Sequence, residues 1–376
     1  MKISLSRPEI TSKDIQSVIK SLKTPYLSLG PRLVEFESKT AKYAGVKYAI
    51  AVNSGTSALH LIVRALGIKG GDEVITTPFS FIASSNSILF EGADPVFVDI
   101  DPNTLNINVD LIERRISKKT KAILAVDVFG HPAEWEALGR IVRKHGLKLI
   151  EDSCEALGSE YKGKRCGSFG DAGAFAFYPN KQITTGEGGM VVTDNSRIAD
   201  LARSMRNQGR GKKSTWLNHV RLGYNYRISE INCVLGSGQI RRIDKIRAKR
   251  GKAADMYNDK LKVIEEIDLP YIAPEVKMSW FVYVIKLKKS FNRRRRDSII
   301  KFLKSKNIGC STYFHPIHLQ PFYRKLYGFK KGMHPVTEYI SERTIALPFF
   351  NNITGEEIDY IFKNLAKAIK KVKKEK

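Results

Sequence analysis

The stretch Tyr48-Ala49-Ile50-Ala51-Val52-Asn53-Ser54-Gly55-Thr56-Ser57-Ala58-Leu59 decides the fold class of this chain. It begins with a short apolar run, residues 48–52, and passes through a turn that contains Gly55 into the amphipathic run 57–66. A buried strand pattern followed at once by a helical pattern is typical of an α/β unit. We therefore expect a strand, a tight turn and a helix here.

The same alternation continues to about residue 195 and defines the architecture. The expected strands are residues 48–52, 73–76, 96–98, 121–126, 147–150, 172–177 and 190–193, and the expected helices between the early ones are residues 57–66, 82–90, 110–116 and 135–145. Two further helices, at 11–22 and 32–43, lead into this region. Strands that alternate with helices predict an α/β fold with a mostly parallel sheet.

The C-terminal part has a different composition. A long helical stretch, residues 228–250, is followed by Pro270 and Pro274 and then by an expected strand at 280–287. We place a domain boundary near residue 245, so that residues 1–245 form a large domain and residues 246–376 a smaller α+β domain. Residues 358–372 carry apolar side chains at helical spacing, with lysines on the opposite face.

The net charge of +26 is the unusual bulk property of this 376-residue chain. Much of the excess lies in Arg293–Arg296 and in the tail 363–376. No aromatic residues alternate with these arginines as a stacking surface for bases requires, so we expect a solvated basic face and no nucleic-acid partner. No apolar run is long enough for a secretory signal or a membrane span, which predicts a cytoplasmic protein without a membrane partner.

Metal-binding patterns are weak. The four cysteines form no C-x-x-C pair. The segment His315-Pro316-Ile317-His318 has two histidines, but Pro316 would break the helix needed to align them. We expect no metal site.

The turn after residue 52 is a candidate anion site. Gly55 permits a tight turn, and the hydroxyls of Thr56 and Ser57 and the free amides of the following helix could together hold a phosphate. An ordinary Ser/Thr helix cap explains the same residues equally well.

Two charged side chains follow other expected strands. Asp152 ends the apolar run 147–152, at the strand end where ligands of α/β proteins bind. Lys181 follows the apolar run 175–178, where partial burial would favour the neutral amine that Schiff-base chemistry needs. The alternative for Asp152 is a strand-end residue that caps the next loop, and the alternative for Lys181 is a surface lysine in a hairpin. An anion site, a carboxylate and an amine together indicate pyridoxal phosphate, with Asp152 at its ring nitrogen and Lys181 as the catalytic lysine.

Several motifs in this order resemble the DegT/StrS family of sugar aminotransferases, which implies the aspartate-aminotransferase type I fold. The resemblance covers almost the whole chain and lies in residues 30–37, 53–59, 71–75, 92–99, 151–152, 177–189 and 223–227.

The resemblance assigns roles to individual residues. It implies that Lys181 carries the cofactor, that Asp152 pairs with the pyridinium nitrogen and that Phe81 stacks on the ring. It also implies that Asn225 reaches the cofactor phosphate of a neighbouring subunit, and hence a homodimer with shared active sites. Glu155 falls where the family often has Gln or His near the 3-hydroxyl of the cofactor.

Two positions depart from the family pattern, and two others match residues that face the sugar. Ala176 replaces a common Ser, which removes one phosphate hydroxyl, and Glu155 leaves the bond to the 3-hydroxyl open. His318 matches the family's Pro-x-His segment, and Tyr313 is a similar candidate for contact with substrate.

These features predict an aminotransferase that moves an amino group, from glutamate, onto a keto-deoxy sugar of a nucleotide-sugar, as in surface-polysaccharide or amino-sugar biosynthesis. A second hypothesis keeps the cofactor but makes the substrate a cyclitol or another ketone. A third, more remote hypothesis is a DNA-binding regulator with an inactive transferase fold, which would show salt-sensitive DNA binding and no need for Lys181.

Overall fold

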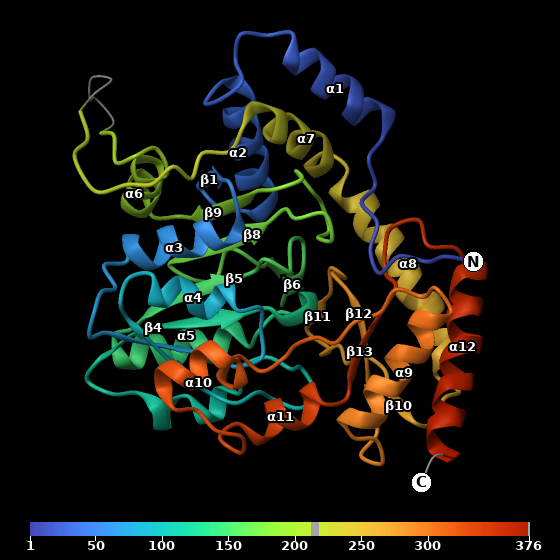
Figure 1. The fold of residues 1–376 in the computed structure, drawn as a ribbon. Coiled ribbons are helices and arrows are strands. Elements are labelled where there is room, and N and C mark those ends of the chain that lie inside the picture. The colour runs from blue at the N-terminus through green and yellow to red at the C-terminus, as the bar shows by residue number, and fades with distance from the viewer. Residues whose placement is uncertain (212–217, 375–376) are drawn as a thin grey trace.

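A seven-stranded sheet forms the centre of the molecule in the computed structural model, which describes residues 1–211 and 218–374 (Figure 1). The strand order is β1-β9-β8-β5-β4-β2-β3, and β9 runs antiparallel to both of its neighbours while the other pairs are parallel. The strands are β1 (Tyr48–Val52), β2 (Glu73–Thr76), β3 (Asp94–Phe97), β4 (Thr120–Val126), β5 (Lys148–Asp152), β8 (Ala172–Ala176) and β9 (Gly189–Thr193). The mostly parallel α/β sheet predicted from the sequence is confirmed, with strand ends within two residues of those expected.

Helices cover both faces of this sheet. The helices of this part are α1 (Ser12–Leu22), α2 (Pro31–Ala44), α3 (Gly55–Ala65), α4 (Ala83–Leu89), α5 (Trp135–His145), α6 (Ser196–Arg206) and α7 (Glu230–Ile240). Along β4, Ile123 packs with residues of α5, whereas its neighbour Leu124 packs with residues of α3, because successive strand side chains point to opposite faces. The same alternation along β5 places Leu149 on the α5 face and Ile150 on the α3 face.

Two expected helices differ in the structure. Residues 110–116 form two short 3₁₀ turns, η1 (Val109–Leu111) and η2 (Glu113–Arg115), and the Asn108 side chain accepts the Asp110 N–H at the first turn. The stretch 228–250 is divided between α7 and α8 (Ile243–Leu261). Arg242 leaves helical geometry at this break and donates hydrogen bonds to Glu9 and Asp14, so a tertiary contact that has no local sequence signal ends the helix.

A second apolar core fills the C-terminal part. Its sheet has the order β10-β12-β13, from β10 (Ile267–Asp268), β12 (Tyr283–Leu287) and β13 (Thr344–Leu347). Helices α8, α9 (Arg293–Ser305) and α12 (Gly355–Lys374) lie beside this sheet (Figure 1). Shorter elements are η3 (Val128–Gly130), β6 (Glu160–Tyr161), β7 (Lys164–Arg165), β11 (Val276–Lys277), η4 (Ile317–Leu319), α10 (Pro321–Tyr327) and α11 (Pro335–Ser341).

The N-terminal segment also belongs to this second core. Ile3 is 1% exposed, and its N–H donates to the carbonyl of Asn307 at 2.9 Å. Helix α8 runs without interruption through residue 245, and its contribution to this core begins at Ala253. The division of the chain at residue 245 stays a prediction.

The basic segments have two different environments. In α12 the apolar face predicted from the sequence is buried, and the last two residues of the tail, 375 and 376, lie outside the described residues. In the run Arg293–Arg296 the expectation of a solvated face is wrong for Arg296, which is 4% exposed and donates to the carbonyl of Ser341 at 2.8 Å. None of the described helices is long and apolar enough to cross a lipid bilayer.

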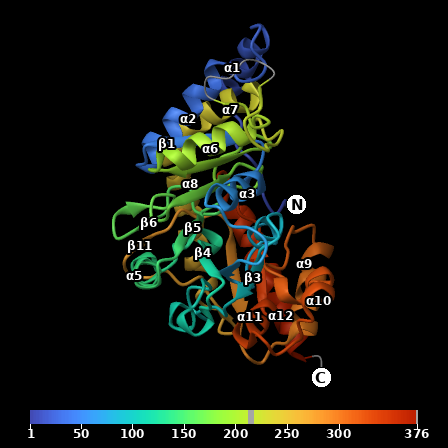
Figure 2. The ribbon, with the colours of Figure 1, turned by 90° about the vertical axis from the view of Figure 1, so that its left-hand side faces the viewer.

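The N-terminal helices form a separate group at one end of the molecule. Figure 2 shows α1, α2 and α7 together beyond β1. Glu230, the first residue of α7, accepts the N–H groups of Gly30, Arg32 and Leu33 at the start of α2, with distances of 3.0, 2.8 and 2.8 Å. This arrangement leaves the opposite face of β1 free for α3, whose N-terminus begins the candidate site.

Candidate active site

A cavity of about 450 Å³ opens where β5, β8 and the N-terminus of α3 meet. Its wall comes from both parts of the chain: α3 contributes Gly55 and Thr56, β5 contributes Asp152, and the C-terminal part contributes Phe281. Six of the predicted site residues besides Asp152 line this cavity, namely Gly55, Thr56, Phe81, Glu155, Lys181 and Tyr313.

Asp152 has a carboxylate with donors but no counter-ion. It is 4% exposed, accepts the Ser84 hydroxyl at 2.6 Å on one oxygen and accepts the Cys154 N–H at 3.2 Å on the other. Among the described residues no Lys, Arg or His forms an ion pair with it. Because a buried carboxylate is stable only when its charge is compensated, this position fits the cationic ring nitrogen of pyridoxal phosphate.

Lys181 also lines the cavity, and its backbone is held in place. Its carbonyl accepts the Arg250 guanidinium at 3.2 Å, and Arg250 also donates to the carbonyl of Phe281 at 3.1 Å. The Lys181 ammonium nitrogen lies 4.0 Å from the centroid of the Phe281 ring. The buried Arg250 side chain therefore links the backbone at Lys181 to the backbone at Phe281, two residues before β12.

Glu155 is the ionic neighbour of Lys181. Its Oε1 lies 3.6 Å from Lys181 Nζ, and its Oε2 accepts the Phe129 N–H at 2.9 Å. Burial raises the pKa of the Glu155 carboxyl, although the Lys181 charge and the Phe129 N–H oppose this shift. Glu155 therefore faces Lys181, and its bond to the 3-hydroxyl of the cofactor stays a prediction.

The start of α3 fits a phosphate in part. Gly55 and Thr56 are the first two residues of the helix, whose N–H groups have no acceptor within it. A Cβ on Gly55 would lie 2.7 Å from the Cβ of Ala176, so only glycine allows this close approach. Ser57 differs from the prediction: its N–H donates to Ser54 Oγ at 3.0 Å and its hydroxyl to Asn53 at 2.6 Å, and it does not line the cavity.

The two aromatic candidates lie at different depths. Phe81 is 63% exposed at the mouth of the cavity, as a side chain that covers a bound ring would be. Tyr313 stacks on Phe314, with ring centroids 5.2 Å apart. Both positions are consistent with contact to a ligand.

Asn225 and His318 lie away from the cavity wall. Asn225 is exposed, while its neighbour Tyr226 turns inward and contacts His60 Nδ1 at 3.0 Å. His318 is 0% exposed and its Nε2 contacts Glu338 Oε1 at 3.0 Å. Burial lowers the pKa of His318. A structural role explains His318 better than contact with a sugar, because its side chain has no access to the cavity.

Sequence reasoning missed several residues of the site. Ser84 lies within α4 and Cys154 beyond β5. Ser84 ends the stretch 79–84 that contains Phe81, but no role was assigned to Ser84 or to Cys154. Phe281 and Arg250 come from distant parts of the chain and meet Lys181 only after folding. Ser54 could have been recognised, because Ser is a preferred residue directly before a helix.

Known proteins share this fold over the full length. The model of the DegT/DnrJ/EryC1/StrS aminotransferase family matches residues 8–366. The chain belongs to this family. This aminotransferase is similar to a GDP-perosamine synthase of Escherichia coli O157:H7, at 35% identity over 364 residues that cover 96% of this chain and 97% of that protein.

Two solved structures are also similar. Helicobacter pylori PseC, an aminotransferase involved in the biosynthesis of pseudoaminic acid, has a TM-score of 0.94 and 31% identity over 99% of this chain and 100% of that one. The Streptococcus pneumoniae protein Spr1654, described as a sugar aminotransferase and solved in its PLP form, has a TM-score of 0.94 and 28% identity over 99% of this chain and 100% of that one. The family resemblance and the fold class inferred from the sequence are confirmed.

Proposed function

We propose that this aminotransferase binds pyridoxal 5′-phosphate in the cavity and transfers an amino group from glutamate to a keto-deoxy sugar of a nucleotide-sugar. The observation that carries the proposal is that a buried carboxylate without a counter-ion, Asp152, and an amine, Lys181, open onto the same cavity beside the N-terminus of α3. The names of the relatives support the sugar substrate, since a GDP-perosamine synthase and a pseudoaminic acid enzyme are both similar over nearly the whole chain.

The bound cofactor supplies an electron sink for the carbon that gains or loses the amino group. Asp152 stabilises positive charge at the ring nitrogen, and the donors Ser84 and Cys154 hold its two oxygens in place. Lys181 Nζ would hold the cofactor, and its amine would move a proton at the carbon that gains or loses the amino group. Phe81, which lines the cavity, would cover the cofactor ring and limit the entry of water.

The phosphate is held by the N–H groups at the start of α3, with the Thr56 hydroxyl beside them. We assign the remaining contact to Asn225 of a second copy, in a homodimer with shared active sites. The exposure of Asn225, with Tyr226 fixed on His60 of its own chain, supports this assignment.

The substrate side of the cavity is aromatic, with Phe281, Tyr313 and Phe314 in its wall. Such a wall suits the apolar face of a deoxy sugar, and the net charge of +26 favours the approach of a diphosphate. Reaction in the cytoplasm, where nucleotide-sugars are found, is part of the proposal.

The test is a pair of half-reactions with the purified, cofactor-loaded protein. Glutamate should change the visible spectrum and release one equivalent of 2-oxoglutarate, and a nucleotide-linked keto-deoxy sugar should restore the spectrum. The same assay with a cyclitol ketone serves as the control substrate. Restoration by the cyclitol alone would contradict the nucleotide-sugar assignment.

A further inference from the structure

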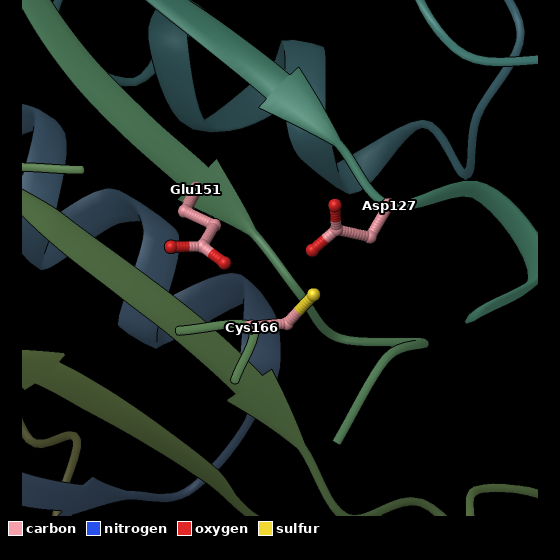
Figure 3. A group of neighbouring side chains, drawn as sticks. All are labelled: Asp127, Glu151 and Cys166. Atoms are coloured by element: carbon pink, nitrogen blue, oxygen red, sulfur yellow. The ribbon is translucent and has the colours of Figure 1, made fainter. Parts of the chain in front are cut away.

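A second buried acidic group lies on the other face of the same strand ends. Asp127 follows β4, Glu151 is in β5, and Cys166 follows β7. One carboxylate oxygen of Asp127, one of Glu151 and the sulfur of Cys166 all lie within 4.8 Å of one another. Figure 3 shows the three side chains pointing toward one another between the strand ends. Both carboxyls are 0% exposed and Cys166 is 1% exposed, so this group is separate from the cavity.

Ser153 joins the two carboxyls. Its hydroxyl oxygen lies 2.6 Å from Asp127 Oδ2 and 2.9 Å from Glu151 Oε1. A hydroxyl has one hydrogen, which it can donate to only one carboxylate. If both carboxyls were ionised, the Ser153 hydroxyl could donate its hydrogen to only one of them. Ser153 Oγ and an oxygen of the other carboxylate would then lie at hydrogen-bond distance with no proton between them, and both atoms are buried. One carboxyl must therefore hold a proton.

The backbone donors decide which carboxyl it is. Glu151 accepts the Gly167 N–H on Oε1 and the Phe169 N–H, at 2.9 Å, on Oε2, so a proton on either oxygen would displace a backbone donor. Asp127 accepts the Ala133 N–H, at 2.8 Å, and the Trp135 indole N–H, at 3.1 Å, on Oδ1 alone. Oδ2 receives no N–H group, so a proton there costs no hydrogen bond.

The charges around the group agree with this assignment. Burial, and next the charge of Glu151, raise the pKa of Asp127 well above its ordinary value. Burial also raises the pKa of Glu151, but the N–H groups of Gly167 and Phe169 oppose that shift. Burial raises the pKa of the Cys166 thiol well above its ordinary value, so it stays a thiol at neutral pH. In residues 1–211 and 218–374 no Lys, Arg or His forms an ion pair with either carboxyl.

We propose that Asp127 is protonated on Oδ2 at neutral pH and that the chain Asp127–Ser153–Glu151 is a directed hydrogen-bond relay that fixes the end of β5. Ser153 directly follows Asp152, and the Asp127 N–H donates to the Asp152 carbonyl at 3.1 Å. Asp127 is thus a positioning residue for Asp152. The two carboxyls that Ser153 bridges, Asp127 and Glu151, carry one negative charge between them, and it lies on Glu151.

The test compares melting temperatures of the wild type, Asp127→Asn and Asp127→Ala between about pH 5 and 9. Because a raised pKa in the folded state costs stability as pH rises from the ordinary Asp value toward the folded value, the wild type should lose stability over this range. The Asn amide donates to Ser153 at every pH, so the melting temperature of D127N should rise relative to that of the wild type as pH increases, by roughly 4 °C or more between the lowest and the highest pH. D127A should melt below both at every pH.

Two results would overturn the proton assignment. The first is a D127N variant that is destabilised at every pH while Glu151→Gln is not, which would place the proton on Glu151. The second is a stoichiometric metal ion in the purified protein, found by elemental analysis and lost in D127N, which would make the group a cation site.

The positioning role rests on the proposed function and has its own readout, the affinity for pyridoxal phosphate measured by absorbance. D127N should bind within about twofold of the wild type, and D127A about tenfold more weakly, because Asp152 loses its support. Equal affinity of all three proteins would overturn the positioning role. A wild type that binds no cofactor would contradict the proposed function, whereas the melting series would still test the proton.

Discussion

Glu151 and Asp152 are neighbours in sequence, yet they lie in different parts of the molecule. Glu151 faces the α5 side of the sheet, where backbone N–H groups and Ser153 satisfy its oxygens. Asp152 faces the cavity, where Ser84 and Cys154 donate to it and no cation within the described chain compensates its charge. Neither carboxylate has an ion-pair partner among the described residues, but only Asp152 lines the cavity. The pair teaches that a buried carboxylate without a cation points to a ligand when it also opens onto a cavity.

The largest effect is expected for Asp152→Asn. The amide cannot stabilise a protonated ring nitrogen, so aminotransferase activity should fall by roughly 10³-fold or more. The melting temperature of the protein without cofactor should stay the same or rise, because a buried unpaired charge is removed. Steady-state kinetics and a thermal melt measure the two effects. Unchanged activity would mean that Asp152 does not face the cofactor.

Glu151→Gln, the matched change one residue away, should act on stability. Its amide nitrogen would face a backbone N–H at Gly167 or Phe169, which leaves a buried donor unsatisfied and costs about 1–3 kcal/mol of unfolding free energy. Denaturant unfolding measures this loss. Activity per folded, cofactor-loaded molecule should change much less than in Asp152→Asn. The reverse pattern, a stable but inactive variant, would show that the two carboxylates have been assigned to the wrong faces.

A smaller effect is expected for Glu155→Gln, and it depends on pH. Burial raises the pKa of Glu155, so the folded wild type loses stability as pH rises from the ordinary Glu value through the folded value. Glutamine still accepts the Phe129 N–H and carries no charge, so the variant should gain relative stability over that window, by about 1 kcal/mol. Melting curves of both proteins without cofactor from about pH 4 to about pH 8 test this, because the range starts just below the ordinary Glu value and extends upward. A constant difference across the window would show that Glu155 is ionised without penalty.

The smallest effect is expected for Ala176→Ser. The side chain of residue 176 lies beside Gly55 in the cavity wall, so a hydroxyl there would add a donor near the N-terminus of α3. A charge-assisted hydrogen bond to phosphate should increase the affinity for pyridoxal phosphate by about fivefold to tenfold. Absorbance titration gives the dissociation constant, and Ala176→Val serves as the control that adds bulk without a donor. A weaker affinity of the Ser variant would place the phosphate elsewhere.

The sheet was predictable because its strands are short apolar runs between breakers, as in Tyr48–Val52, which ends shortly before Gly55, the first residue of α3. Asp152, at the end of β5, and Lys181, five residues beyond β8, could be predicted as site residues because each follows an apolar run. Ser84, Arg250 and Phe281 could not, because each contributes only through a contact formed by distant segments. His318 shows the opposite case, since its motif suggested substrate contact while its burial against Glu338 favours a structural role.

The most direct test of the account is to reduce the cofactor-loaded protein with borohydride and to map the labelled peptide by mass spectrometry. The account predicts loss of the visible absorption band and a single label on Lys181, which lines the same cavity as Asp152. A label on any other lysine, or a protein that binds no cofactor at all, would contradict it.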